Sequence, residues 1–93
     1  MKNETFRTFD IANYLTSKEL IAEYLSQVLA DGDTDELLEA LGHIARSKSM
    51  THISRETGLR RESLYKSLQA GGNPRFETVV KVLKSFDIQL QAV

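Results

Sequence analysis

Residues 50–68 of the chain read MTHISRETGLRRESLYKSL, and this stretch decides the predicted fold. Its apolar residues have the spacing of two short helices, one on each side of Gly58. Glycine adopts the left-handed backbone of a tight turn more readily than other residues do. Ile53 would then face the core from the first helix, and Leu64 with Leu68 would anchor the inner face of the second. The pattern predicts a helix-turn-helix.

The second of these helices presents polar side chains on its outer face. Arginine forks onto guanine and glutamate accepts a hydrogen bond from the cytosine amine, so such a face is suited to the major groove of DNA. The predicted base contacts are Arg61, Glu62, Ser63, Tyr65 and Lys66. The predicted phosphate contacts are Ser49, Thr51, His52, Arg60, Asn73 and Arg75. The alternative is an ordinary helical hairpin whose charges are only solvated.

The segments on both sides also have helical spacing. Residues 16–19 have the form of a capping box before an apolar stripe at 20–29, and a shorter helical turn is predicted at 10–15. Gly32 would end the first long helix in the left-handed conformation, and Asp33 would cap the next one. Asn73 would cap the last helix with Pro74 as its first residue.

The tail changes its period from helical to alternating. Ile88, Leu90 and Ala92 alternate with glutamines, which is typical of a β-strand. Because a lone strand is not stable, we expect it to pair with the same strand of a second copy. These three residues are therefore the predicted dimer contacts.

Charge is divided unevenly along the 93 residues, which are expected to form one domain. Residues 1–42 carry three basic and nine acidic side chains, a balance of −6, whereas residues 43–93 carry nine and four, a balance of +5. The total of −1 therefore conceals an acidic and a basic part. Such asymmetry indicates surfaces with different partners, DNA for the basic part and a basic protein for the acidic part.

Several classes of protein are excluded or disfavoured. The absence of cysteine excludes a disulfide scaffold, a zinc finger and a thiol enzyme. No apolar run is long enough for a membrane span and no signal-peptide pattern opens the chain, so a cytoplasmic protein is expected. No catalytic constellation stands out, and neither an enzyme nor a cofactor is expected. His43 and His52 lack a third ligand, and capping explains the acids at 31–36 better than calcium does, so no metal is expected.

Residues 53–59, 62–68 and 72–83 resemble the Cro/C1-type (Xre-like) helix-turn-helix. Within that class the sequence is similar, over about residues 6–92, to the HigA-like antitoxins, the addiction-module antidotes encoded beside RelE/ParE-type toxins. The resemblance implies an all-α, lambda-repressor-like domain of five to six helices with a short C-terminal strand. It also implies a dimer that neutralises its toxin and represses its own operon on double-stranded DNA.

Matched by position, Arg61, Glu62 and Lys66 fall where relatives contact bases. Met50 and Arg60 depart from the usual glutamine and the usual serine or threonine, and Asp87 replaces a frequent glycine. The candidate toxin contacts are Phe6, Phe9, Tyr14 and Tyr24. A stand-alone prophage-type repressor, a pure protein-interaction module and a small enzyme are the competing interpretations.

Overall fold

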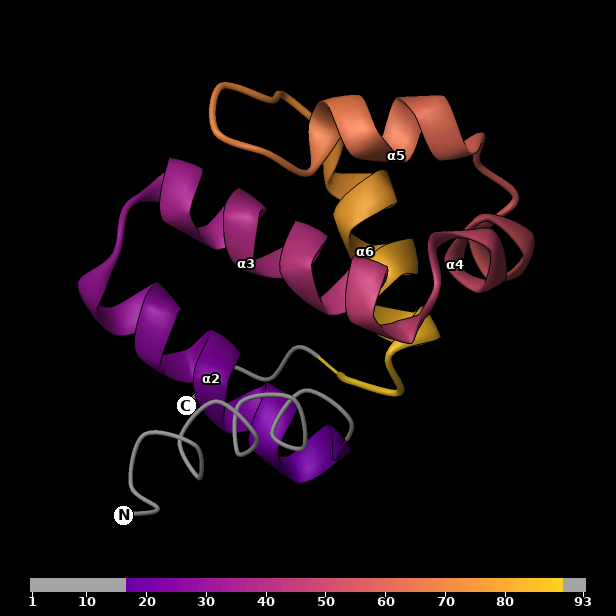
Figure 1. Ribbon diagram of the computed structural model, residues 1–93. Helices are drawn as coiled ribbons and strands as arrows, with labels where there is room; N and C mark the ends of the chain where they lie inside the picture. Colours follow the sequence, from indigo (N-terminus) through magenta and orange to yellow (C-terminus); the bar gives the residue numbers. More distant parts are fainter. Residues whose placement is uncertain (1–16, 90–93) are drawn as a thin grey trace, which may run out of the picture.

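The computed structural model describes residues 17–89 and forms five helices within them (Figure 1). They are α2 (Lys18–Asp31), α3 (Thr34–Lys48), α4 (Met50–Thr57), α5 (Arg61–Ser67) and α6 (Phe76–Ser85). For these residues the prediction of an all-helical fold is confirmed. The helical turn predicted at residues 10–15 lies outside the described residues. No helix in the described range is both long and apolar enough to cross a membrane.

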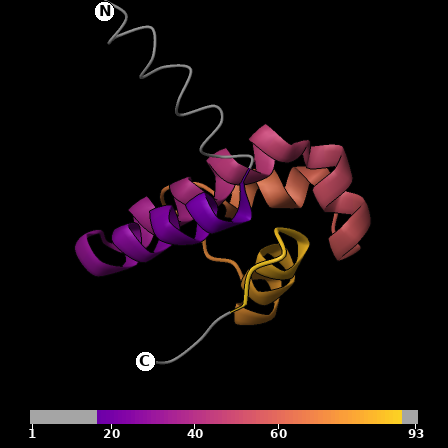
Figure 2. The same ribbon diagram turned by 90° about the horizontal axis from the view of Figure 1, so that it is seen from below.

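Helix α3 is the centre of the arrangement. It contacts α2 along one side and α4 and α5 elsewhere, while α6 packs on α4. Seen from below, the α2–α3 pair runs lengthwise and α6 lies on one side of it (Figure 2). All five helices contribute to a single buried core, whose largest fully buried side chains are Phe86, Ile21, Leu41, Ile44, Ile53, Leu64, Leu68 and Val82.

Helix α2 begins and ends differently from the prediction. Its N-cap is Ser17, whose hydroxyl accepts a hydrogen bond from the amide of Leu20 at 3.4 Å. Gly32 follows the helix in an extended conformation, with φ −98°, so the predicted left-handed stop is wrong. A Cβ at this position would lie 2.8 Å from the carbonyl oxygen of Val28. Close packing against the end of α2, rather than a left-handed turn, therefore explains the glycine.

Helix α3 begins with the cap that the sequence predicted. Asp33 Oδ1 accepts from the amide of Glu36 at 2.9 Å, and Glu36 Oε1 accepts from the amide of Asp33 at 3.1 Å. This reciprocal capping box satisfies two amides that have no partner inside the helix.

Replacing Asp33 with Ala should lower the free energy of unfolding by about 1 kcal/mol, because the amide of Glu36 loses its acceptor. Chemical denaturation followed by circular dichroism measures the change. Thr34→Ala, one residue into the same helix, is the control and should change the midpoint much less. Equal losses in both variants would contradict the role given to the cap.

Helix α6 begins later than predicted. Its N-cap is Arg75, which makes no side-chain capping bond, so Asn73 and Pro74 precede the helix and the prediction for them is wrong. Close packing constrains the loop before it, because a Cβ on Gly72 would lie 2.2 Å from the carbonyl oxygen of Ser67. Phe76, the first residue of α6, is 72% exposed.

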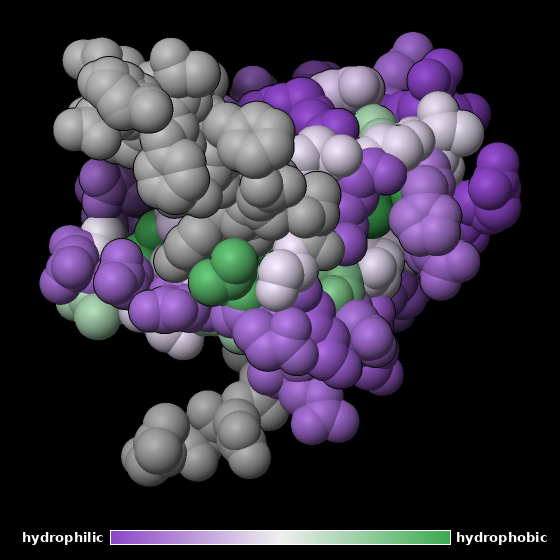
Figure 3. Space-filling view, turned by 60° about the horizontal axis from the view of Figure 1, so that its bottom comes forward, coloured by the Kyte–Doolittle hydropathy of each residue, from purple (hydrophilic) through white to green (hydrophobic). Residues whose placement is uncertain are grey.

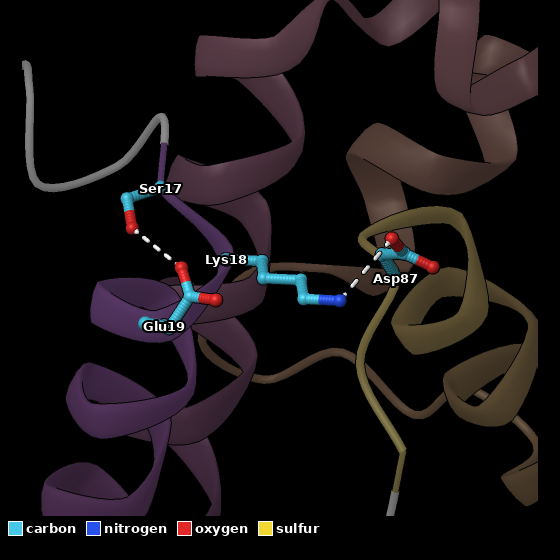
Figure 4. Close-up of polar contacts among 4 residues, drawn as sticks. All are labelled: Ser17, Lys18, Glu19 and Asp87. Carbon is cyan, nitrogen blue, oxygen red and sulfur yellow. Dashed lines mark hydrogen bonds and ion pairs between the residues drawn. The ribbon is translucent and has the colours of Figure 1, made fainter.

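Helix α6 ends in a Schellman motif. Asp87 takes the left-handed conformation with φ 68°, as expected of a residue that replaces glycine there. The amide of Asp87 donates to Lys84 O at 2.9 Å, and the amide of Ile88 donates to Leu83 O at 3.0 Å. The Asp87 carboxylate also lies 3.7 Å from Lys18 Nζ, which links the end of α6 to the start of α2 (Figure 4).

The predicted C-terminal strand is not formed by the residues described up to Gln89. Ile88 and Gln89 are irregular, and Ile88 packs partly against the chain's own core. Leu90 and Ala92 lie outside the described residues. The physical reason is that a strand needs a pairing partner, and residues 17–89 of a single copy contain no other strand.

Candidate nucleic-acid interface

Side chains of α4 close the turn between α4 and α5. Gly58 is left-handed, with φ 74°, as the sequence predicted, and its amide donates to Ser54 O at 2.9 Å. Thr57 is buried; its hydroxyl donates to Ile53 O at 2.7 Å and accepts from the amide of Leu59 at 3.2 Å. The Ser54 hydroxyl donates to the carbonyl oxygen of Leu59. These bonds fix the direction in which α5 leaves the turn.

Thr57 was not singled out from the sequence. The signal that could have identified it is a hydroxyl immediately before the turn glycine, where it can bond to both sides of the turn. Ser54, three residues earlier in α4, provides a second side-chain bond across the turn.

Helix α5 has one buried and one exposed face, as predicted. Leu64 and Leu68 are fully buried in the core. The five predicted base-contacting residues are all exposed: Arg61, Glu62, Ser63, Tyr65 and Lys66. The fold therefore presents on α5 a face of polar side chains that is free of core packing.

Arg61 also connects α5 to the start of α4. Its Nη1 atom donates a hydrogen bond to Thr51 Oγ1 at 3.3 Å. A guanidinium group carries five N–H donors, so this bond leaves others available for a ligand. The structure thus brings together one predicted base contact and one predicted phosphate contact.

The six predicted phosphate contacts occupy three places and are all exposed. Ser49, Thr51 and His52 lie at the start of α4, Arg60 is the N-cap of α5, and Asn73 and Arg75 lie in the loop before α6. Arg75 and Ser63 line one groove between α5 and α6, so the loop borders the exposed face of α5. Lys81 lines the same groove, and sequence reasoning assigned it no role.

Two departures from the resemblance have clear structural consequences. Met50 is only 5% exposed and packs in the core, so it fills apolar space where relatives are expected to carry a polar glutamine. Arg60 is the N-cap of α5 but makes no side-chain capping bond, which a serine or threonine at this position could supply.

Ser49 joins α3 to α4 in a conformation that serine rarely adopts. Its φ is 105°, in the region that favours glycine. Its amide donates to Ala45 O at 3.0 Å, and its hydroxyl accepts from the amide of His52 at 3.3 Å. The strained residue therefore serves as both the end of one helix and the cap of the next.

The acidic part of the chain forms a separate groove between α2 and α3. Tyr24 lines it with Asp31, Glu36 and Glu39, and the tyrosine packs partly against the core. The other three candidate toxin contacts, Phe6, Phe9 and Tyr14, lie outside the described residues. On the side shown in Figure 3, the coloured surface is mostly hydrophilic with small apolar spots.

The histidines show no metal-binding arrangement within residues 17–89. His43 Nδ1 accepts a hydrogen bond from Arg46 at 3.0 Å. No three histidine, aspartate or glutamate side chains of the described residues are placed to hold a metal ion.

Comparison with known proteins identifies a family and a similar protein. The family model described as "Probable addiction module antidote protein" matches residues 5–93. An uncharacterized protein of Haemophilus influenzae is 46% identical over 88 residues, which cover 95% of this chain and 91% of the relative. No solved structure matches.

Proposed function

We propose that this chain, which belongs to the family of probable addiction module antidote proteins, is a DNA-binding antitoxin of a toxin–antitoxin module. The family match over residues 5–93 carries the antidote part of this proposal and implies a toxin partner. The finer proposal is a HigA-like protein that binds and neutralises a RelE/ParE-type toxin and represses its own operon.

The exposed face of α5 supports the DNA-binding part. Turn bonds to Ser54 and Thr57 fix the direction of α5, and Leu64 and Leu68 anchor its inner face, so its five exposed polar side chains are held on one rigid element. We assign base reading in the major groove to this face, in the manner of a Cro/C1-type helix-turn-helix. The exposed residues at the start of α4 and before α6 would bind DNA phosphates on either side of the base pairs that α5 reads.

A homodimer follows from the small size of this face. A helix of 7 residues reads few base pairs, so strong specificity needs two copies on half-sites about 34 Å apart. The predicted contacts remain Ile88, Leu90 and Ala92. Ile88 lines an apolar groove with Val80 and Leu83 on α6, which offers a second copy more surface than the tail alone.

The acidic groove between α2 and α3 supports the choice of a basic toxin surface as the partner. A toxin that acts on RNA must carry positive charge, and Asp31, Glu36 and Glu39 would attract it. Tyr24, in the same groove, is the toxin contact that lies within the described residues. In this proposal the protein is a cytoplasmic binding protein without enzymatic activity or cofactor, associated with the nucleoid when bound to DNA.

One experiment with two measurements tests the proposal. The tagged chain is co-expressed with the product of the neighbouring reading frame, and the purified protein is then mixed with the DNA upstream of its own gene. We expect the neighbour to co-purify and its growth inhibition to be relieved. We also expect a gel shift that weakens as salt rises.

Each outcome has a distinct meaning. A DNA shift without any toxin partner would favour the stand-alone repressor over the antitoxin. Toxin binding with unchanged DNA mobility at low salt would contradict the DNA-binding part and favour a pure protein-interaction module.

A further inference from the structure

A carboxylate from the acidic part of the chain holds the loop that follows α5. Asp35 Oδ1 accepts a hydrogen bond from the amide of Gly71 at 2.9 Å, across 36 positions of sequence. Asp35 lies in the first turn of α3, and Gly71 lies in the loop between α5 and α6. Figure 1 shows this loop running beside the start of α3. The contact therefore crosses from the acidic part to the proposed DNA interface.

The same side of α3 approaches the end of α5 very closely. A Cβ on Gly42 would lie 2.3 Å from the carbonyl oxygen of Leu68, so the α3 backbone meets the end of α5 with no room for a side chain. Gly42 and Asp35 are seven residues apart, which is about two turns and places them on one face of the helix. Helix α3 thus positions the end of α5 through Gly42 and the following loop through Asp35.

The loop needs such a restraint. Gly71 is left-handed, with φ 83°, and is followed by a second glycine, so the free loop has many accessible backbone conformations. Inside the loop, the amide of Gly72 donates to Gln69 O at 2.9 Å, which closes a local turn. The Asp35–Gly71 bond ties that turn to α3. Asn73 and Arg75, the proposed phosphate contacts, come directly after it.

We propose that Asp35 is a positioning residue of the DNA interface, which rests on the proposed function. Its carboxylate fixes the loop so that Asn73 and Arg75 face the DNA backbone in register with α5. This role predicts an effect on DNA affinity opposite to the one that charge alone predicts. A carboxylate near DNA repels phosphate, so removing it should strengthen binding unless the hydrogen bond to Gly71 matters more.

Two substitutions at Asp35 separate the hydrogen bond from the charge. Asp35→Asn removes the charge and keeps an oxygen acceptor, whereas Asp35→Ala removes both. Glu23→Ala, an exposed residue on α2, is the control for loss of one negative charge. Binding of upstream DNA is measured by fluorescence anisotropy at low salt, after denaturation shows that each variant is folded. Hydrogen exchange at the Gly71 amide is measured without DNA.

We expect Asp35→Ala to raise Kd about two- to tenfold, the size of one net hydrogen bond. Asp35→Asn and Glu23→Ala should bind as tightly as the wild type or more tightly. Exchange at Gly71 should be faster in Asp35→Ala than in Asp35→Asn. If the wild type binds DNA and the two Asp35 variants have the same Kd, the positioning role is overturned and the proposed function stands. If the wild type fails to bind DNA, the positioning role and the DNA-binding part of the proposed function are both overturned.

Discussion

Replacing Phe86 with Ala should lower the free energy of unfolding by about 3–5 kcal/mol. The side chain is 1% exposed and lies in the one core to which all five described helices contribute. Removing it leaves a cavity at the end of α6, where the Schellman motif fixes the backbone and limits collapse around the gap. Urea denaturation followed by circular dichroism measures the loss as a lower midpoint at an unchanged slope.

Phe76 provides a matched control because it is the same residue type at the other end of α6. It is 72% exposed, so Phe76→Ala should change the free energy of unfolding by less than about 0.5 kcal/mol. Similar losses in the two variants would contradict the placement of Phe86 in the core and of Phe76 at the surface. In Phe86→Ala, DNA affinity should fall only as far as the unfolded fraction requires, because the buried side chain cannot contact DNA.

Local sequence signals predicted the start of α3, the turn after α4 and the buried face of α5 well. The glycine at 58, the capping aspartate at 33 and the leucines of α5 each act within a few residues, and the structure confirms all of them. The start of α6 could not be predicted in this way. Asn73 and Pro74 resemble a helix start locally, but contacts from elsewhere hold this loop. Asp35, which is distant in sequence, accepts a hydrogen bond from Gly71, and Gly72 packs closely on Ser67. Such contacts leave no periodic pattern in the sequence.

The division of charge predicted two surfaces, and the structure modifies that interpretation. The acidic and basic parts share one core, because Ile21 and Leu41 belong to the same buried cluster as Leu64 and Val82. The parts are therefore not separate folding units within the described residues. Asp35, which belongs to the acidic part, also accepts a hydrogen bond from Gly71 at the edge of the proposed DNA interface. Overall net charge is consequently a poor guide to which residues support DNA binding.

Arg61 and Arg75 differ in where the fold holds them, and this difference predicts different roles on DNA. Arg61 begins α5, whose direction is fixed by the turn, and its guanidinium is hydrogen bonded to Thr51. A side chain held in this way can meet one base pair in a defined register. Arg75 lies in the loop before α6 and borders the groove beside Ser63, which suits a contact to the DNA backbone.

Arg61→Ala should therefore cost roughly 1–3 kcal/mol of binding free energy on the operator and relax the preference at one base pair. Arg75→Ala should weaken binding to every duplex by a similar factor and reduce the slope of log affinity against log salt by about one. Titrations of both variants on the operator and on a shuffled duplex, at several salt concentrations, measure these effects. The wild-type discrimination between the two duplexes should shrink only in Arg61→Ala. If both variants lose the same factor on both duplexes, Arg61 contacts phosphate and the assignment of α5 to base reading fails.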